Sequence, residues 1–292
     1  MPGCGTPRAN TTFLIDYNAL PSDDSLARER FLEHTRNTEV DNPEWYVSAA
    51  NFYYSKSDSY VNISTKPPEA GDVALTESPS GQVAGSISAA PPNADDVSTA
   101  VEILRRGLQR FPDRLDMRFG LAHILQSARD ADKEIVVLEE TAQYAATHAT
   151  QLRWMHDGDL PSPAEQFIPE TLQSYAKYYF DQEDPAGSAY ALAISALSMR
   201  FYPKHPYAYN SLAVYWYTKN DLTKALAYLR QAHDRDPNDP LVLYNLANIS
   251  RELGDAPEAR RYFELVLACK TTETDLRMAA QQKLNELGAC PR

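Results

Sequence analysis

A spacing of 34 residues constrains the fold of this chain more than any other feature of its sequence. Three consecutive segments begin at residues 172, 206 and 240, and each has alanine at its twentieth position. These alanines are Ala191, Ala225 and Ala259. Tyrosine or leucine fills the fourth and seventh positions of every segment, at Tyr175, Tyr209 and Leu243, and at Tyr178, Leu212 and Leu246. A repeated spacing of this length predicts stacked helical hairpins.

The spacing within each segment explains why a hairpin forms. Positions 4, 7, 8 and 11 share one stripe of a first helix, and positions 20, 24 and 27 share one stripe of a second. Alanine at position 20 of every segment, and at position 8 of the last two, allows the two helices to approach closely. The second helices are expected to start after the N-cap residues Asp184, Asp221 and Asp255. Proline then ends the second helix, so the stretch DRDPNDP before Leu241 is predicted to be a turn between repeats rather than a metal loop.

These positions match the pattern W-x2-L-G-x2-Y, followed by Ala, Phe and Pro, and the chain therefore resembles the tetratricopeptide repeat family. The resemblance covers roughly two thirds of the chain and is strongest from residue 172 to residue 271. Ser195, Ser198 and Thr271 depart from the pattern. The resemblance implies an all-α solenoid of TPR helix hairpins from a bacterial protein. The residue pattern between two of its helices adds a small inserted β-hairpin or β-meander.

The same frame organises the rest of the chain. Weaker repeats are predicted over residues 23–148, after a flexible tail at residues 1–22. Residues 149–171 form an inserted connection, residues 172–273 form three repeats, and residues 274–292 form a capping helix and tail. A capping helix covers the apolar end of a stack of repeats.

A β-prone insert interrupts the weaker repeats at about residues 57–95. The runs SYVNIST, DVALTE and QVAGSI are separated by turn signals at Pro67-Pro68 and Pro79-Ser80-Gly81. We expect a small β-meander between the two helices of one repeat. The alternative is a mobile loop, because the stretch is rich in Ser, Pro and Gly.

The connection at residues 149–171 contains His156, Asp157 and Asp159. These side chains could bind a divalent metal or pair a base with a carboxylate, but no third ligand follows at helical spacing. We therefore expect a solvated loop. Ser162 and Pro163 are expected to open the next helix, as N-cap and first residue.

The formal charge of the chain is −12, and residues 1–98 alone carry a net charge of −8. Nucleic acid is therefore not an expected partner, because phosphate binding needs a cationic surface. No apolar run is long enough to span a membrane, so the chain is expected to be cytoplasmic. Gly3-Cys4-Gly5 resembles the end of a bacterial lipoprotein cleavage box, which leaves lipidation of Cys4 and a periplasmic or envelope location as the alternative.

No phosphate loop, dinucleotide fingerprint, HExxH or GxSxG motif occurs in the sequence, and no catalyst, cofactor or metal site is predicted. In an alternative hypothesis, the protein is an enzyme with a hydrolytic site near His156. The sequence does not provide a nucleophile, base and orienting group for it.

The family resemblance implies that the first helices line a concave groove that binds a peptide or helix of a partner protein. Positions 2, 5, 9 and 12 of the repeats are expected to face it. The predicted groove residues are Phe180, Tyr207, Asn210, Tyr217, Tyr244, Asn248 and Arg251. We expect a non-enzymatic interaction scaffold, although some of these aromatic residues could instead pack against the next repeat. The alternative is a lipid-anchored cell-envelope assembly or structural factor that acts through the β insert.

Overall fold

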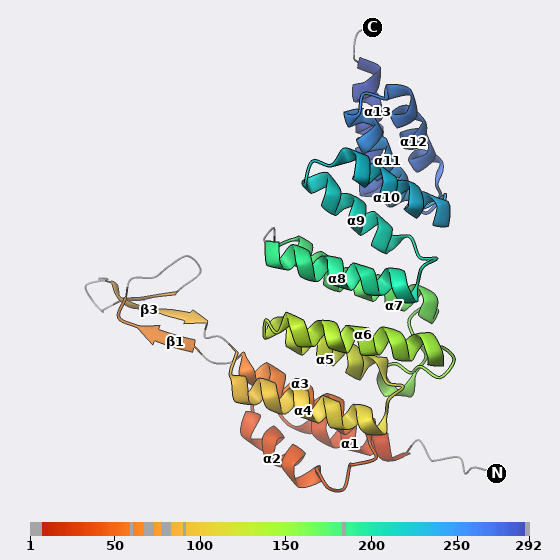
Figure 1. Cartoon of the computed structure of the whole chain (residues 1–292). Helices are drawn as coiled ribbons and strands as arrows, with labels where there is room; N and C mark the ends of the chain where they lie inside the picture. The colour runs from red at the N-terminus through yellow and green to blue at the C-terminus, as the bar shows by residue number, and fades with distance from the viewer. Residues whose placement is uncertain are drawn as a thin grey trace, which may run out of the picture. The chain divides into compact units, whose positions relative to one another are not determined.

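The structure is a computed structural model that describes residues 8–58, 61–66, 73–76, 83–89, 92–182 and 185–289. The chain forms two compact units. Their helices and strands are labelled in Figure 1. The first contains Met1–Val137 and Thr150–Asp159, and the second contains Leu138–Ala149 and Leu160–Arg292. Cys4, the predicted lipidation site, lies outside the described residues.

The helices of the first unit include one that the sequence analysis did not predict. They are α1 (Arg8–Ala19), α2 (Ser25–Thr35), α3 (Pro43–Ser57), α4 (Ala94–Arg110), α5 (Leu115–Ser127) and the start of α6 (Ala131–His148). Residues 8–19 were expected to belong to a flexible tail, and that prediction is wrong for them. Phe13 and Tyr17 of α1 are buried, and their rings lie 5.7 and 6.1 Å from the ring of Phe31 in α2. This aromatic cluster supplies the apolar contact that orders α1.

The β insert forms a three-stranded antiparallel sheet between α3 and α4, two helices that pack against each other. Its strands are β1 (Val61–Ser64), β2 (Val73–Thr76) and β3 (Val83–Ala89). The strand order is β1-β3-β2, with β3 in the middle. A simple meander would place β2 in the middle, so the predicted connectivity is corrected while the β character and the location are confirmed.

A buried ion-pair cluster attaches the connection after α6 to the first unit. Arg114 is 1% exposed, and its guanidinium lies 2.9 Å from Glu44, 2.7 Å from Asp116 and 3.2 Å from Asp157. The amide of Leu115 donates to the carbonyl of Arg153 at 2.9 Å. The connection was expected to be only a solvated loop. The side chain of Asp157 is indeed 51% exposed, but the loop is tied down by Arg114 and by backbone hydrogen bonds.

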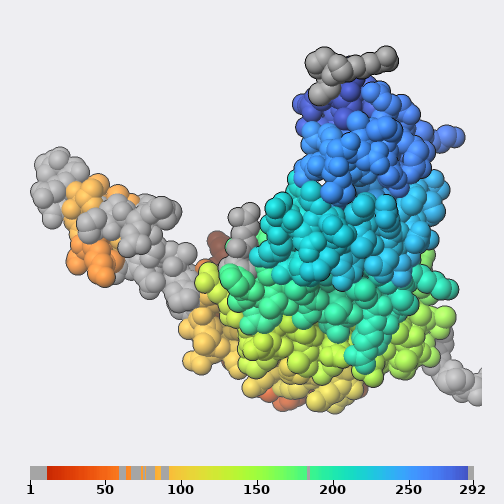
Figure 2. Space-filling model, turned by 45° about the horizontal axis from the view of Figure 1, so that its top comes forward, coloured from red at the N-terminus to blue at the C-terminus, as the bar shows by residue number. Residues whose placement is uncertain are grey.

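The second unit contains the hairpins that the 34-residue spacing predicts. They are α7 (Ala164–Phe180) with α8 (Pro185–Phe201), α9 (Tyr207–Thr218) with α10 (Leu222–Arg235), and α11 (Pro240–Glu252) with α12 (Ala256–Ala268). A final helix, α13 (Thr274–Ala289), packs on α12 and α11 as a cap. In the space-filling view, α9 to α13 form one continuous packed body, coloured cyan to blue (Figure 2).

The repeat positions behave as their spacing requires. Ala191, Ala225 and Ala259 are all 0% exposed. Asp221 and Asp255 cap α10 and α12 by accepting backbone hydrogen bonds from Lys224 and Glu258. Asp184, the third predicted cap, lies outside the described residues. The turn before α11 is confirmed, because α10 ends at Arg235 and α11 begins at Pro240.

Two local predictions in α7 need correction. The helix opens after Pro163, which is the N-cap and makes no side-chain capping bond, so Ser162 is not the cap. Tyr178, expected in the apolar seam, is 41% exposed, while its neighbour Tyr179 is buried. In this repeat, position 8 of the predicted stripe therefore faces the core and position 7 does not. None of the helices in the described part of the chain is long and apolar enough to cross a membrane.

Candidate interaction site

A pocket of about 250 Å³ lies between α9 and α11, the first helices of two successive repeats. Ala213, Leu229 and Ile249 form its buried floor. Its more exposed lining consists of Val214, Tyr217, Asn245, Asn248, Arg251 and Glu252. The site therefore combines an apolar floor with a rim that offers both hydrogen-bond donors and acceptors, which is the usual character of a ligand site.

Tyr217 provides the exposed aromatic group of this pocket. Its side chain is 40% exposed, and Val214, one turn earlier on α9, is 42% exposed. The Tyr217 hydroxyl donates to Oε1 of Glu252 at 2.5 Å, and this hydrogen bond is the main reason that the pKa of Tyr217 is raised. The bond fixes the ring at the pocket edge, so less side-chain freedom would be lost on binding.

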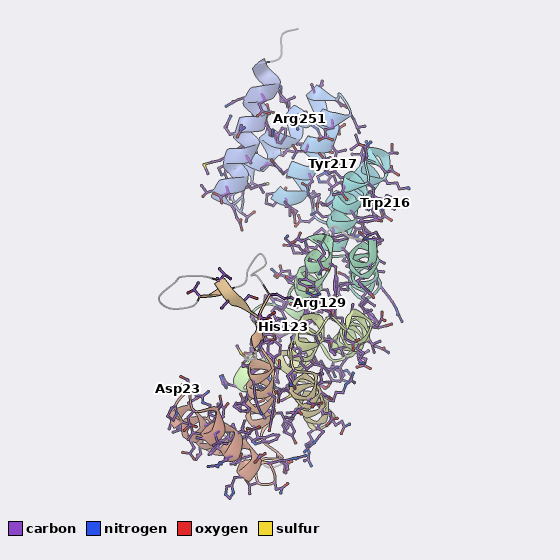
Figure 3. All side chains as sticks on the ribbon, turned by 90° about the vertical axis from the view of Figure 1, so that its left-hand side faces the viewer. Asp23, His123, Arg129, Trp216, Tyr217 and Arg251 are labelled. Atoms are coloured by element: carbon purple, nitrogen blue, oxygen red, sulfur yellow. The ribbon has the colours of Figure 1, made fainter. Side chains whose placement is uncertain are left out.

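Arg251 and Asn248 supply polar groups on α11. The Nε atom of Arg251 is buried and has no hydrogen-bond partner within the described residues. Nη1 of its guanidinium lies 3.8 Å from Oε2 of Glu286 in α13. Asn248 donates through Nδ2 to the carbonyl of Tyr244 at 3.1 Å. Because that bond fixes the amide, its carbonyl oxygen is oriented to accept a hydrogen bond. Figure 3 shows Tyr217 and Arg251 on neighbouring helices of this region.

Three of the seven predicted groove residues line the pocket, namely Tyr217, Asn248 and Arg251. Asn210 is 3% exposed, and its Oδ1 accepts a hydrogen bond from Asn245 Nδ2 at 2.8 Å. It therefore joins α9 to α11 inside the unit and is not free to bind a partner. This corrects its predicted role.

The other three predicted residues pack against neighbours within the second unit. The ring of Tyr244 meets Phe263 edge-on at 5.7 Å and packs, partly buried, against the core around α11 and α12. The ring of Tyr207 lies 4.5 Å from His205, and partial burial raises its pKa. Phe180 lies 5.8 Å from Tyr215. None of the three lines the pocket, and only Phe180 packs against the next repeat, as the alternative expected.

Sequence reasoning missed Asn245 and Glu252, which stand at positions 6 and 13 of the last repeat. We expected the groove at positions 2, 5, 9 and 12 only. In the structure, α11 also presents the neighbouring stripe to α9, so that Glu252 meets Tyr217 of the preceding repeat. The available signal was the separation of 35 residues between Tyr217 and Glu252, one more than the repeat length.

The alternative site near His156 has a different character. His156 and Asp157 both adopt left-handed backbone angles, with φ of 57° and 56°. Nδ1 of His156 lies 3.2 Å from Oε2 of Glu44, a carboxylate that also faces Arg114. These contacts between charged side chains attach the loop to the start of α3 and to Arg114. Among the described residues, no group of His, Cys, Asp and Glu side chains is arranged to hold a metal ion.

Comparisons with known proteins agree with this architecture. Two family models, both described as tetratricopeptide repeat, match residues 176–240 and residues 217–283. Together they span the hairpins that build the α9–α11 pocket. Residues 176–283 are therefore tetratricopeptide repeats (TPRs). The comparison with curated proteins gave no match.

Solved structures with this fold resemble the chain at low identity. A thermophilic TPR protein of Thermus thermophilus is 18% identical, with a TM-score of 0.38, and the match covers 65% of this chain and 92% of that one. PilF of Pseudomonas aeruginosa is 16% identical, with a TM-score of 0.38 over 67% of this chain and 81% of that one. The first TPR of Spaghetti, solved with an HSP90 peptide, is 16% identical, with a TM-score of 0.36 over 41% of this chain and 92% of that one.

Proposed function

We propose that this TPR protein is a non-enzymatic interaction scaffold whose α9–α11 pocket binds an extended segment or helix of a partner protein. The observation that carries the proposal is a pocket with an apolar floor and a polar rim. Val214 and Tyr217 line this pocket and are exposed. Exposed apolar side chains beside a concave site are the usual anchors of a protein interface.

The polar rim defines what such a partner would offer. The carbonyl oxygen of Asn248 would accept a backbone N–H, and the guanidinium of Arg251 would donate to a backbone carbonyl or a carboxylate. The floor formed by Ala213, Leu229 and Ile249 would receive one aliphatic or aromatic side chain. Glu252 already holds the Tyr217 hydroxyl, so it contributes mainly by fixing that ring.

The chain offers a matched control for testing this proposal. Tyr178 in α7 is 41% exposed, almost the same as Tyr217, but it does not line the pocket. A partner would first be identified by affinity capture and mass spectrometry, and its dissociation constant would then be measured with purified proteins. Tyr217→Ala is expected to cost about 2 kcal/mol of binding free energy, as aromatic anchors typically do. Tyr178→Ala should leave the affinity unchanged, and equal losses in both variants would contradict the proposal.

The β sheet supports a second candidate function, in which the insert makes the contact of an envelope-associated factor. Strands β1 and β2 each pair only with β3 in the described sheet, so each has one open edge. An open edge can pair with an extended strand of another chain. A partner whose affinity survives Tyr217→Ala but is lost when residues 60–92 are replaced by a Gly/Ser linker would favour this candidate.

A further inference from the structure

Three turns between consecutive helices share one backbone geometry but differ in the residue that adopts it. Arg129, Asn220 and Gly254 follow α5, α9 and α11, with positive φ angles of 59°, 59° and 82°. In each turn, the next residue is an aspartate whose amide donates to a carbonyl five residues earlier, as in Asp130 to Leu125 at 2.9 Å. This is the Schellman ending of a helix, in which glycine or asparagine is the usual left-handed residue.

Arg129 is the exception in this set. A left-handed backbone is unfavourable by about 1 kcal/mol for a residue with a long side chain, whereas glycine adopts it freely. The turn itself gives no reason for arginine, because its hydrogen bonds are made by the backbone. The side chain of Arg129 is exposed and has no hydrogen bond or ion pair within the described residues. Strain at a residue whose side chain points to solvent calls for a function of that side chain.

Arg129 lies at the rim of the pocket between α4 and the α5–α6 turn, which measures about 970 Å³. Val97, Val101 and Ala128 give this pocket an apolar surface. Arg105 from α4 stands on the rim with Arg129, and it too is exposed without an ion pair among the described residues. All of these residues belong to the first unit, and Figure 3 shows Arg129 there with His123 of the preceding helix.

The charged side chains of this rim carry more positive than negative charge. Lys133 and Asp130 neutralise each other, with Nζ 2.5 Å from Oδ2. Asp130 also caps α6 by accepting from the amide of Lys133 at 3.3 Å. Glu102 is then the only carboxylate of this lining to set against Arg105 and Arg129. A rim with excess positive charge on a chain of charge −12 is complementary to an acidic ligand.

We propose that this pocket binds an acidic segment of a partner protein, in which an aliphatic side chain lies on Val97 and Val101 and flanking carboxylates pair with Arg105 and Arg129. Guanidinium groups bind carboxylates through two parallel hydrogen bonds, which suits them to this role. The capped Schellman turn fixes the backbone of Arg129 in advance, so its positioning costs little on binding. The surface shares no residue with the α9–α11 pocket and does not depend on its function.

The test uses the full chain and a short fluorescent peptide of alternating Leu and Glu, followed by anisotropy. A second peptide has Gln in place of every Glu. Arg129→Gly removes the charge and relieves the backbone, so the melting temperature should stay equal or rise. With Arg105→Gln added, the acidic peptide should bind about tenfold more weakly, as expected for the loss of charge-assisted hydrogen bonds. Arg30→Gln, which removes one positive charge from the exposed face of α2, should leave binding within about twofold of wild type.

Several results would overturn the proposal. They are absence of acidic-peptide binding by the wild-type chain, equal affinity for the Glu and Gln peptides, and equal loss in the Arg30→Gln control. A short oligothymidine serves as the competing ligand. If it binds and the two arginine changes abolish that binding while the acidic peptide is unaffected, the surface recognises phosphate and the proposal is wrong.

Discussion

Arg114 and Glu44 form an ion pair in which both partners are withdrawn from solvent: Nη1 lies 2.9 Å from Oε1, and the side chains are 1% and 4% exposed. Arg114 precedes α5, and Glu44 lies in the first turn of α3. Asp116 and the loop residue Asp157 complete the shell of the guanidinium. One buried cation therefore holds together two helix starts and the connection after α6.

Replacing Arg114 by Met is expected to destabilise the first unit by about 3 to 5 kcal/mol, because Glu44 and Asp116 would remain buried without a counter-charge. Urea unfolding monitored by circular dichroism measures the loss. Arg110→Met is the control, since Arg110 and Asp41 pair at an exposed site and such pairs contribute about 1 kcal/mol or less. Similar effects of the two changes would mean that the Arg114 cluster is not a buried network.

Ala225→Leu tests the packing of α9 against α10. Ala225 is 0% exposed, so the larger side chain should overpack the hairpin and lower stability by about 1 to 3 kcal/mol. Ala227, two residues further along α10, is exposed, and Ala227→Leu should change the melting temperature little. If both variants melt like the wild type, the assigned helix faces are wrong.

Gly85→Ala tests the β insert alone. A Cβ atom at Gly85 would lie 2.1 Å from the carbonyl oxygen of Ser64, so the pairing of β1 with β3 requires glycine at this position. The variant should lose protection from hydrogen exchange in residues 61–64 while the helical signal and its melting temperature stay unchanged. Gly120→Ala is the control, because its nearest contact would be an ordinary 3.8 Å from Leu104. Collapse of the whole first unit in Gly85→Ala would show that the sheet is part of its core.

His205 predicts a pH dependence of stability. Burial lowers its pKa below the ordinary 6.5, and the carboxylates of Glu170 and Asp236 only partly oppose this. Below pH 6.5 the unfolded chain takes up a proton that the folded chain resists, so His205 makes the unfolding free energy fall as the pH falls. The unfolding free energy of the wild type, relative to that of His205→Gln, should therefore decrease as the pH is lowered from about 7.5 to 5. A difference that is constant with pH, or that shifts the other way, would contradict a buried neutral imidazole.

The sequence predicted the repeated hairpins because their determinants are local. Ala191, Ala225 and Ala259 recur at the repeat length, and the caps at Asp221 and Asp255 lie at the starts of helices. The burial of Arg114 was not predictable in this way. Its partners Glu44 and Asp157 lie 70 and 43 residues away in the sequence. An arginine just before a helix is ordinarily exposed to solvent.

The candidate site was predicted only in part for a related reason. The repeat frame identifies the face of α9 and α11 that turns to the groove, and Tyr217 and Arg251 follow from it. It does not give the rotation between successive repeats, which buries Asn210 against Asn245 and brings Glu252 to Tyr217. The order of strands in the β insert depends on pairing between distant residues and was likewise not available from its alternating pattern.

The most direct test of the interaction function is a photo-crosslinking measurement at Tyr217. Benzoylphenylalanine would replace Tyr217 in one variant and the equally exposed Tyr178 in another, and both would be irradiated with the captured partner. We predict that crosslinks to the partner form at position 217 and are absent at position 178, with the crosslinked peptide carrying an apolar side chain. Crosslinking at position 178 alone, or at neither position while the partner remains bound, would contradict binding in the α9–α11 pocket.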